Sequence, residues 1–242
     1  MLAKGSAPWL LTLVAISTLA AIAHITVYWP YTGIIALLGL AGLIFFIFFF
    51  RDPERETEHC CSSMTAPADG KIVDIRGRKI CIFMNVHNVH VNRAPLTGTV
   101  IAIEHKKGGY RPAFCKDSER NERSHIFIDT EHGIVEVIQI AGTIARRIVS
   151  YVQVGDQMVR GQRFGMIRFG SRVDVTIPEN FDILCTKGDK VTAGMTVIAR
   201  KRNANEYNTQ EVEFLTVPES FDILCSKGGI ITAGTSVSYG KE

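Results

Sequence analysis

The sequence predicts a mainly β domain that follows a two-helix transmembrane hairpin. Two apolar stretches near the N-terminus, residues 7–28 and 33–50, each have about the 20 residues that cross a hydrocarbon core. The rest of the chain is rich in short β-branched runs bounded by Gly, Pro or Asp, as strands are. At 242 residues, the chain is long enough for one membrane segment and one domain with a core of its own.

The segment between the two apolar stretches, residues 28–31 (YWPY), is aromatic and turn-forming, as the tip of a hairpin at a membrane interface should be. The first stretch lacks a clear small-residue cleavage site, and the second follows at once, which disfavours a secretory signal. Lys4 precedes the first stretch, and Arg51 and Arg55 follow the second. By the positive-inside rule, we expect both ends of the hairpin in the cytoplasm and the β domain on the cytoplasmic face of the cell membrane.

Candidate strands occur at six places in the domain: residues 71–75, 79–84, 98–103, 133–140, 164–168 and 173–175. The one candidate helix covers residues 145–151. Two further segments, 154–162 and 187–195, combine a Gly-Asp turn with a second Gly, which predicts tight hairpins. These hairpins resemble those of barrel-sandwich domains, the fold of biotinyl and lipoyl carriers. The carrier lysine motif is missing, so the likeness implies a barrel-sandwich-like fold and not a carrier function.

The C-terminal part of the chain contains a repeat, because residues 176–199 return in part at 216–239, after a basic linker. A single extra copy is too little for a solenoid, and we interpret it as a partial duplication. The expected organisation is a transmembrane hairpin, a short linker, a β domain, and a basic linker with the partial repeat: residues 1–50, 51–63, 64–199 and 200–242.

Charge and cysteine content disfavour two classes of function. The net charge of +3 and the isoelectric point near 8.5 are too mild to indicate a nucleic-acid partner. The six cysteines form no C-x-x-C pair and no cluster with histidine at the spacing of metal ligands. We therefore expect neither a structural zinc site nor a disulfide framework.

Three polar residues, far apart in the sequence, are candidates for one catalytic set: Asp69, His90 and Ser171. Asp69 lies in a Pro-Ala-Asp-Gly turn before a strand, and Ser171 lies in a Gly-Ser joint between two strands. In such a set, the imidazole takes the proton of the hydroxyl, and the carboxylate holds the imidazole in the right tautomer. Structural alternatives stand beside this interpretation: an Asx turn at Asp69, and a bend or bulge at Ser171.

The histidines at positions 87 and 90 lie in a run of valines and asparagines that favours extended chain. In an extended segment, residues three apart point to opposite faces, so His87 and His90 should not share one metal or one role. The alternative is a metal-binding H-x-x-H pair on a helix.

Five short motifs occur in order along the chain: Arg51-Asp52-Pro53, Pro67-Ala68-Asp69-Gly70, the run from His87 to Pro95, Asn121-Glu122-Arg123, and the run from Phe169 to Asp174. Together they resemble the short, membrane-anchored form of phosphatidylserine decarboxylase, including the archaeal relatives that act on archaetidylserine. The resemblance covers residues 51–199 and the hairpin before them. The family pattern does not require the repeat that follows residue 200.

The resemblance implies that the chain cuts itself between Gly170 and Ser171. With His90 as base, the Ser171 hydroxyl attacks the carbonyl of Gly170, and elimination then converts Ser171 into a covalent pyruvoyl cofactor. This group forms a Schiff base with the amine of phosphatidylserine or archaetidylserine and accepts the electrons left when carbon dioxide departs, giving phosphatidylethanolamine or archaetidylethanolamine. The resemblance assigns Asp69 to the self-cleaving set and His87 to substrate binding and protonation of the carbanion. It implies no metal and no pyridoxal phosphate.

The resemblance also implies partners: a serine-headed lipid in the membrane and the two cleavage fragments of the chain, which stay associated. A homodimer is left open. Arg93, Arg111 and Arg123 are candidates for the phosphodiester, because guanidinium groups suit that anion, or else ordinary surface cations.

Two other functions fit parts of the sequence. One is a membrane-anchored barrel-sandwich adaptor without catalysis, in which Gly170-Ser171 is only a turn. The other is a serine hydrolase that uses Asp69, His90 and Ser171 on an external substrate, although the chain lacks a G-x-S-x-G elbow.

Overall fold

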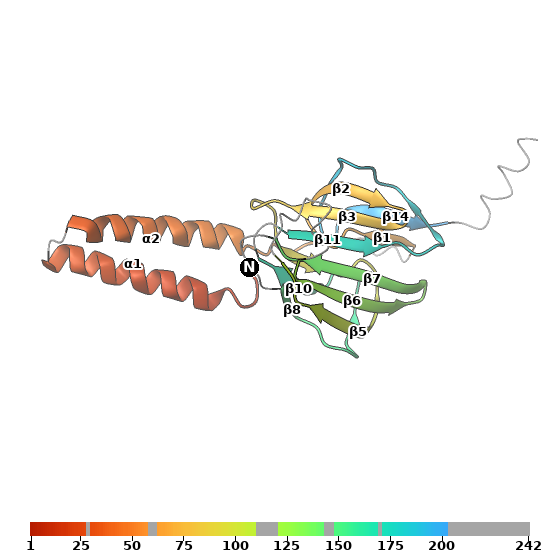
Figure 1. Cartoon of the computed structure of the whole chain (residues 1–242), viewed down its shortest axis with the longest axis horizontal. Coiled ribbons are helices and arrows are strands. Elements are labelled where there is room, and N and C mark those ends of the chain that lie inside the picture. Colours follow the sequence, from red (N-terminus) through yellow and green to blue (C-terminus); the bar gives the residue numbers. More distant parts are fainter. Residues whose placement is uncertain (28–29, 58–61, 110–120, 143–147, 169–170, 203–242) are drawn as a thin grey trace, which may run out of the picture. The chain divides into compact units, whose positions relative to one another are not determined.

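The computed structural model describes residues 1–27, 30–57, 62–109, 121–142, 148–168 and 171–202 (Figure 1). By its contacts, the chain divides into two units, Met1–Arg202 and Asn203–Glu242. The repeat predicted at 216–239 lies outside the described residues, so the fold described below is that of the first unit.

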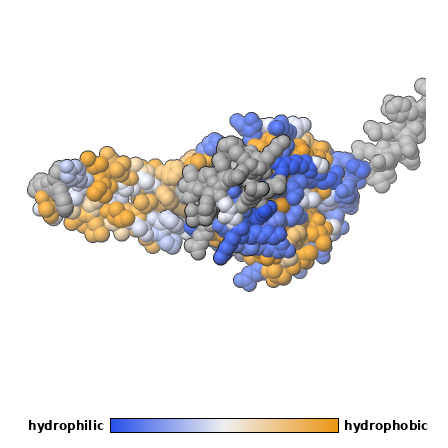
Figure 2. All heavy atoms as spheres, in the orientation of Figure 1, coloured by the Kyte–Doolittle hydropathy of each residue, from blue (hydrophilic) through white to orange (hydrophobic). Residues whose placement is uncertain are grey.

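The N-terminal part forms two helices that run side by side, α1 (Ala7–Val27) and α2 (Pro30–Phe49) (Figure 1). Both are long and apolar enough to cross a membrane. Apolar side chains cover the outside of the pair (Figure 2), and Leu11, Leu19 and Leu37 are each about two-thirds exposed to the surroundings of the protein. An exposed apolar surface of this extent suits lipid and not water. The predicted helical hairpin is confirmed, and it indicates association with a membrane.

The domain that follows is mainly β, as predicted. The large sheet contains eight strands: β2 (Gly70–Arg76), β3 (Lys79–Met84), β5 (Gly98–Lys106), β6 (Arg123–Thr130), β7 (Gly133–Ile140), β9 (Gln157–Met158), β11 (Ser171–Thr176) and β13 (Lys190–Val191). Their order is β13-β2-β3-β11-β7-β6-β5-β9, every pair is antiparallel, and the sheet curls into a half-barrel (Figure 1).

Two three-stranded sheets complete the described part of the domain. One contains β1 (Ser63–Thr65), β14 (Val197–Lys201) and β12 (Phe181–Ile183). The other contains β4 (Val91–Arg93), β10 (Arg163–Ile167) and β8 (Ile148–Ser150). Alternate residues of the large sheet, such as Ile72, Ile126 and Ile128, are fully buried in one core with Phe164 and Phe181 of the small sheets. Because buried residues alternate along these strands, one face of the half-barrel packs against the strands of the two small sheets.

The domain contains an internal two-fold similarity that the sequence analysis missed. Residues 66–72 and 94–100 both begin Ala-Pro and place a Gly at the start of a strand. A Cβ at Gly70 would lie 2.1 Å from the carbonyl oxygen of Phe83, and one at Gly98 would lie 2.3 Å from that of Asp129. Both positions therefore require glycine for the same reason, a close approach of the neighbouring backbone.

The two Gly-Asp segments occupy equivalent places in this similarity. Gly188 N donates to the carbonyl of Ile72, and Gly155 N donates to that of Val100 (both 2.8 Å). The prediction that each segment is a hairpin is wrong. Their short strands, β13 and β9, pair with β2 and β5 instead of with themselves, because Gly188 (φ 108°) and Gly155 (φ 96°) turn the chain directly onto the sheet.

The helix predicted at 145–151 is also wrong over its described part. Ile148–Ser150 is strand β8, paired with β10, since the β-branched Ile148 and Val149 suit a ladder better than a helix; residues 143–147 lie outside the described residues. Cys81 and Cys185 are buried free thiols, and the other four cysteines lie outside the described residues.

Candidate active site

The strand register brings two of the candidate residues to one end of the large sheet. β3 ends at Met84, which pairs with Ser171 at the start of β11. β2 starts immediately after Asp69, and its second residue, Lys71, pairs with Phe83 of β3. Asp69 and Ser171 therefore lie at the same end of three neighbouring strands, β2, β3 and β11.

His90 returns to this end of the sheet after a turn that follows β3. The amide of Ile167, the last residue of β10, donates to the carbonyl of His90 (3.2 Å). The same strand runs on toward Ser171, so the backbone of His90 lies beside the segment that leads into the Gly-Ser joint. Residues 169–170 lie outside the described residues, and the prediction for Gly170 lies there with them.

Ser171 is fully buried, and its Oγ has no hydrogen-bond partner among the described residues. A buried hydroxyl without a partner is costly and therefore uncommon. The Oγ atom is not used in a hydrogen bond to the described residues, so Ser171 is a candidate for a reactive group.

His90 is fully buried as well, and the geometry fixes its neutral tautomer. The Nδ1 atom lies 2.9 Å from the carbonyl oxygen of Asn88. Because a carbonyl only accepts, Nδ1 carries the proton, and Nε2 is left as a basic lone pair. Nε2 is buried and has no hydrogen-bond partner among the described residues. Thus His90 presents an unused base at the same end of the sheet as the unused hydroxyl of Ser171.

The membrane helix contributes to the surroundings of this base. The ring of Phe49, the last residue of α2, lies against the His90 imidazole with 4.4 Å between ring centroids. Burial lowers the pKa of His90 to about 4, and the negative charge of Asp69 opposes this shift. The imidazole is consequently neutral, and able to accept a proton, throughout the physiological range.

The extended conformation predicted around the two histidines is wrong. Residues 86–88 form a turn, in which Asn88 N donates to the carbonyl of Asn85 (2.9 Å) and Asn85 N donates to Oδ1 of Asn88 (2.8 Å). The asparagine side chains complete the turn, which competes with the strand that the valines favour. His87 is exposed and His90 is buried, so the two still face different surroundings, but because of the turn. No group of three potential metal ligands occurs among the described residues.

Asp69 is held by a cation that the sequence analysis did not assign to it. Arg55 donates to both of its carboxylate oxygens (2.6 and 2.8 Å), and the amide of Ala193 donates to Oδ1 (2.8 Å). Among the described residues, no hydrogen bond joins Asp69 to His90. The structure places the two at the same end of the sheet without direct contact, and Asn88 is the residue that orients the imidazole.

The Arg-Asp-Pro motif explains how the linker reaches this site. Asp52 is buried and pairs with Arg163 (2.6 Å) and with Arg93 (3.4 Å). Arg93 also donates to the carbonyls of Pro53 and Gly161 (both 2.9 Å). These contacts fasten the linker to the domain, so Arg93 is neither a surface cation nor free for a phosphodiester. Of the other two candidates, Arg111 lies outside the described residues, and Arg123 is half-buried at the start of β6 and stays a candidate.

A second buried pair supports β11 directly behind Ser171. Arg172 donates to both carboxylate oxygens of Asp174, each at 2.7 Å, and both side chains are almost fully buried. A bidentate pair of this kind is geometrically rigid. It fixes the strand whose first residue is Ser171.

A comparison with known families fits this geometry. The family model described as phosphatidylserine decarboxylase matches residues 43–199. This chain belongs to the phosphatidylserine decarboxylase family. The match covers the end of α2, the linker and the whole described β domain up to β14, and it ends before the segment 200–242.

Individual relatives agree with the family match. The proteins of Methanosarcina barkeri and Methanococcoides burtonii named "Putative archaetidylserine decarboxylase proenzyme" are 56% and 55% identical, over 82% and 84% of this chain and 98% of each relative. The phosphatidylserine decarboxylase proenzyme of Streptomyces griseus is 46% identical, over 82% of this chain and 93% of the relative. The phosphatidylserine decarboxylase family is one of carboxy-lyases.

Proposed function

We propose that this protein is a pyruvoyl-dependent decarboxylase of serine-headed membrane lipids, phosphatidylserine or archaetidylserine, with the corresponding ethanolamine lipid as product. The observation that carries the proposal is the pair of buried, unused atoms, Ser171 Oγ and His90 Nε2, at one end of the sheet in a chain of this family. We place the catalytic domain at residues 64–199. The test is release of carbon dioxide by purified protein from each of the two serine lipids in mixed micelles, with the ethanolamine lipid identified as product.

Maturation, in this proposal, uses only groups of the chain. His90 Nε2 takes the proton of Ser171 Oγ, and the oxygen attacks the carbonyl carbon of Gly170. The C–N bond breaks, an ester replaces the peptide, and the nitrogen of Ser171 becomes a free amine. Loss of the Cα proton and cleavage of the Cβ–O bond then release the Gly170 carboxylate. The remaining unsaturated amine takes up water and loses ammonia, which leaves a ketone at the new N-terminus.

The surroundings of Ser171 suit this group. They are buried, and His90 Nε2 at the same end of the sheet is a buried basic atom that has no hydrogen-bond partner among the described residues. When present, the ketone would supply an electrophile for the lipid amine and an electron sink for the electron pair that stays on the α carbon when carbon dioxide leaves. We assign His87, which is exposed on the adjacent turn, to the substrate, where it returns a proton to the decarboxylated carbon. The carboxylate of Asp69 acts on His90 through its charge.

The strand order supports lasting association of the two fragments that this cleavage produces. β11, the first element of the C-terminal fragment, lies between β3 and β7 of the N-terminal fragment and pairs with both. β13 pairs with β2, and β14 pairs with β1. Because these ladders and the shared core cross the cut, the fragments should separate only when the domain unfolds.

The pH dependence of self-cleavage tests the role of His90. The cleavage rate should stay nearly constant between about pH 7 and pH 5, because burial holds the pKa of the imidazole at about 4 and the base stays neutral. It should fall to half near pH 4, where His90 becomes protonated. The measurement is the cleaved fraction against time on a gel, for precursor made by cell-free synthesis and transferred to buffers of different pH. A midpoint near 6.5, the ordinary imidazole value, would show that another, solvated base does the work.

Thiol labelling tests the orientation in the membrane. We propose that the N-terminus and the domain lie in the cytoplasm, as Lys4, Arg51 and Arg55 indicate. A membrane-impermeant maleimide added to intact cells should therefore leave Cys60 and Cys61 unlabelled. A Trp29→Cys variant, with its new thiol at the expected outer tip of the hairpin, is the matched control and should label. Efficient labelling of Cys60 and Cys61, without labelling of the tip, would invert the topology.

A further inference from the structure

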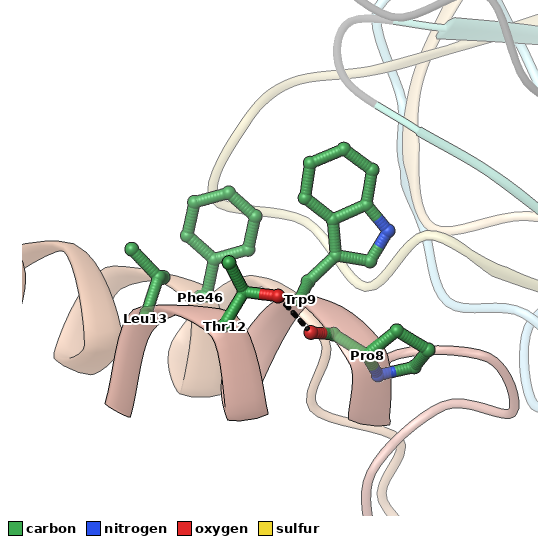
Figure 3. A pocket seen from close by; sticks show the side chains of 5 residues that line it. All are labelled: Pro8, Trp9, Thr12, Leu13 and Phe46. Atoms are coloured by element: carbon green, nitrogen blue, oxygen red, sulfur yellow. Dashed lines mark hydrogen bonds between the residues drawn. The ribbon is translucent and has the colours of Figure 1, made fainter. Parts of the chain in front are cut away.

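An open apolar groove lies where the helical hairpin meets the β domain. It has a volume of about 390 Å³, within the range of small-molecule sites, and five residues of the two helices line it: Pro8, Trp9, Thr12, Leu13 and Phe46 (Figure 3). The rings of Trp9 and Phe46 are stacked, with centroids 6.2 Å apart. The hydroxyl of Thr12 is turned away to the carbonyl of Pro8 (2.7 Å), so the groove surface is hydrocarbon.

The groove lies at the level where the lipid headgroups begin. Trp9 is in the first turn of α1, and Phe46 is in the last turn of α2, so both mark the end of the apolar spans that faces the domain. Aromatic side chains at such positions belong to the interfacial belt of a bilayer. A lipid that occupies this groove would hold its phosphate just outside it, on the side of the domain.

A cation lies on that side. The guanidinium carbon of Arg168 is 5.5 Å from the centroid of the Trp9 ring, and its Nη2 donates to the carbonyl of Gly5 (3.4 Å). Arg168 is 8% exposed. A guanidinium is attracted to the face of an aromatic ring, and its planar fork of N–H groups matches the oxygens of a phosphate.

Two observations place the groove and Arg168 close to Ser171 and His90. Arg168 follows β10 directly and precedes Ser171 by three residues, a step of at most about 10 Å along an extended chain. Phe46 packs on the apolar cluster that contains Phe49, and Phe49 lies against His90. In a serine-headed lipid, the phosphate and the amine are separated by only two carbons, which suits a phosphate site this close to Ser171.

We propose that Arg168 binds the phosphodiester of the lipid substrate, while the groove that Trp9 and Phe46 help to line holds the first segment of one hydrocarbon chain. This inference rests on the proposed function and adds the site that recognises the lipid. It replaces the earlier candidate Arg93, which is engaged by Asp52 and by backbone carbonyls. It also gives the hairpin a role in substrate binding in addition to anchoring.

The test compares two substrates that differ in one charge: a serine lipid with its natural phosphodiester, and the same lipid as the methyl phosphotriester. Arg168→Gln should lower kcat/KM for the phosphodiester by about 10- to 100-fold, because a hydrogen-bonded charge contact is lost, and should change the rate with the phosphotriester little. Arg168→Lys keeps the positive charge but loses the paired N–H groups of the guanidinium. Its kcat/KM for the phosphodiester should lie between the values of the wild type and of Arg168→Gln. Rates are normalised to the cleaved fraction seen on a gel.

Lys4→Gln is the matched control, since it removes an exposed cation from the same interface without touching the groove. It should change the rates with both substrates by the same factor. If Arg168→Gln keeps the wild-type preference for the phosphodiester, the inference is wrong. If Arg168→Gln fails to self-cleave, Arg168→Lys is used instead. If Arg168→Lys keeps the wild-type preference for the phosphodiester over the phosphotriester, the proposed phosphate site is refuted. Wild-type protein that releases no carbon dioxide from either lipid would instead refute the proposed function, and this inference with it.

Discussion

Ser171→Ala is expected to give a single uncut chain that releases no carbon dioxide. Without the hydroxyl there is no nucleophile for the carbonyl of Gly170, and no precursor for the ketone. Loss of a member of a serine–histidine set lowers rates by about 10⁴-fold or more, so uncut chain should dominate on a laboratory timescale. A gel and a carbon dioxide assay on the same membrane preparation measure both effects.

Ser124→Ala provides the matched control for this change. Like Ser171, Ser124 is a buried serine near the start of a strand, but its strand is β6 and not β11. It should mature and turn over like the parent. If Ser171→Ala is still cut between residues 170 and 171, or if it is uncut and fully active, the reactive role of Ser171 is refuted.

His90→Ala and His87→Ala are expected to fail at different stages. His90→Ala should remain uncut, with a loss of about 10⁴-fold in cleavage rate, because no other base is assigned to Ser171 Oγ. His87→Ala should be cut normally and then decarboxylate about 10²- to 10⁴-fold more slowly, for want of the proton donor. Asp69→Ala should slow cleavage strongly with some residual cutting, because Asn88 still orients the imidazole while the charge near it is lost.

The readouts are the cleaved fraction and the carbon dioxide released per cleaved chain. His105→Ala, which replaces a half-exposed histidine on β5, is the control and should behave like the parent. An uncut His87→Ala together with a normally matured His90→Ala would reverse the two assignments. If both variants mature and turn over like the parent, the histidines are structural and the proposed mechanism fails.

The strands were predictable where local sequence and tertiary packing agree. Both β3 and β7 begin and end at the residues expected, because each is a β-branched run between turn-forming residues. The turn at residues 86–88 was not predicted, because its stability comes from the side chains of Asn85 and Asn88, which bond to the backbone in a way that strand propensities do not express.

The candidate site was predictable as a set of residue types but not as a set of contacts. That Asp69 would pair with Arg55, and that Phe49 would cover His90, depends on the paths of the linker and of α2 relative to the domain. Those paths are determined by long-range packing, which no local pattern encodes. Residues 66–72 and 94–100 share only Ala-Pro and a later Gly, which is too short a similarity to indicate a repeat from sequence alone. The equivalent hydrogen bonds that Ile72 and Val100 accept make it evident in the structure.

The intact mass of the purified wild-type protein tests the central claim most directly. We expect two fragments: residues 1–170, ending in a free carboxylate, and residues 171–242, lighter by one ammonia than a fragment that starts with serine and blocked to Edman sequencing. A C-terminal fragment that starts with an unmodified Ser171 would show simple hydrolysis of the peptide and no cofactor. A single uncut chain in active material would contradict the account altogether.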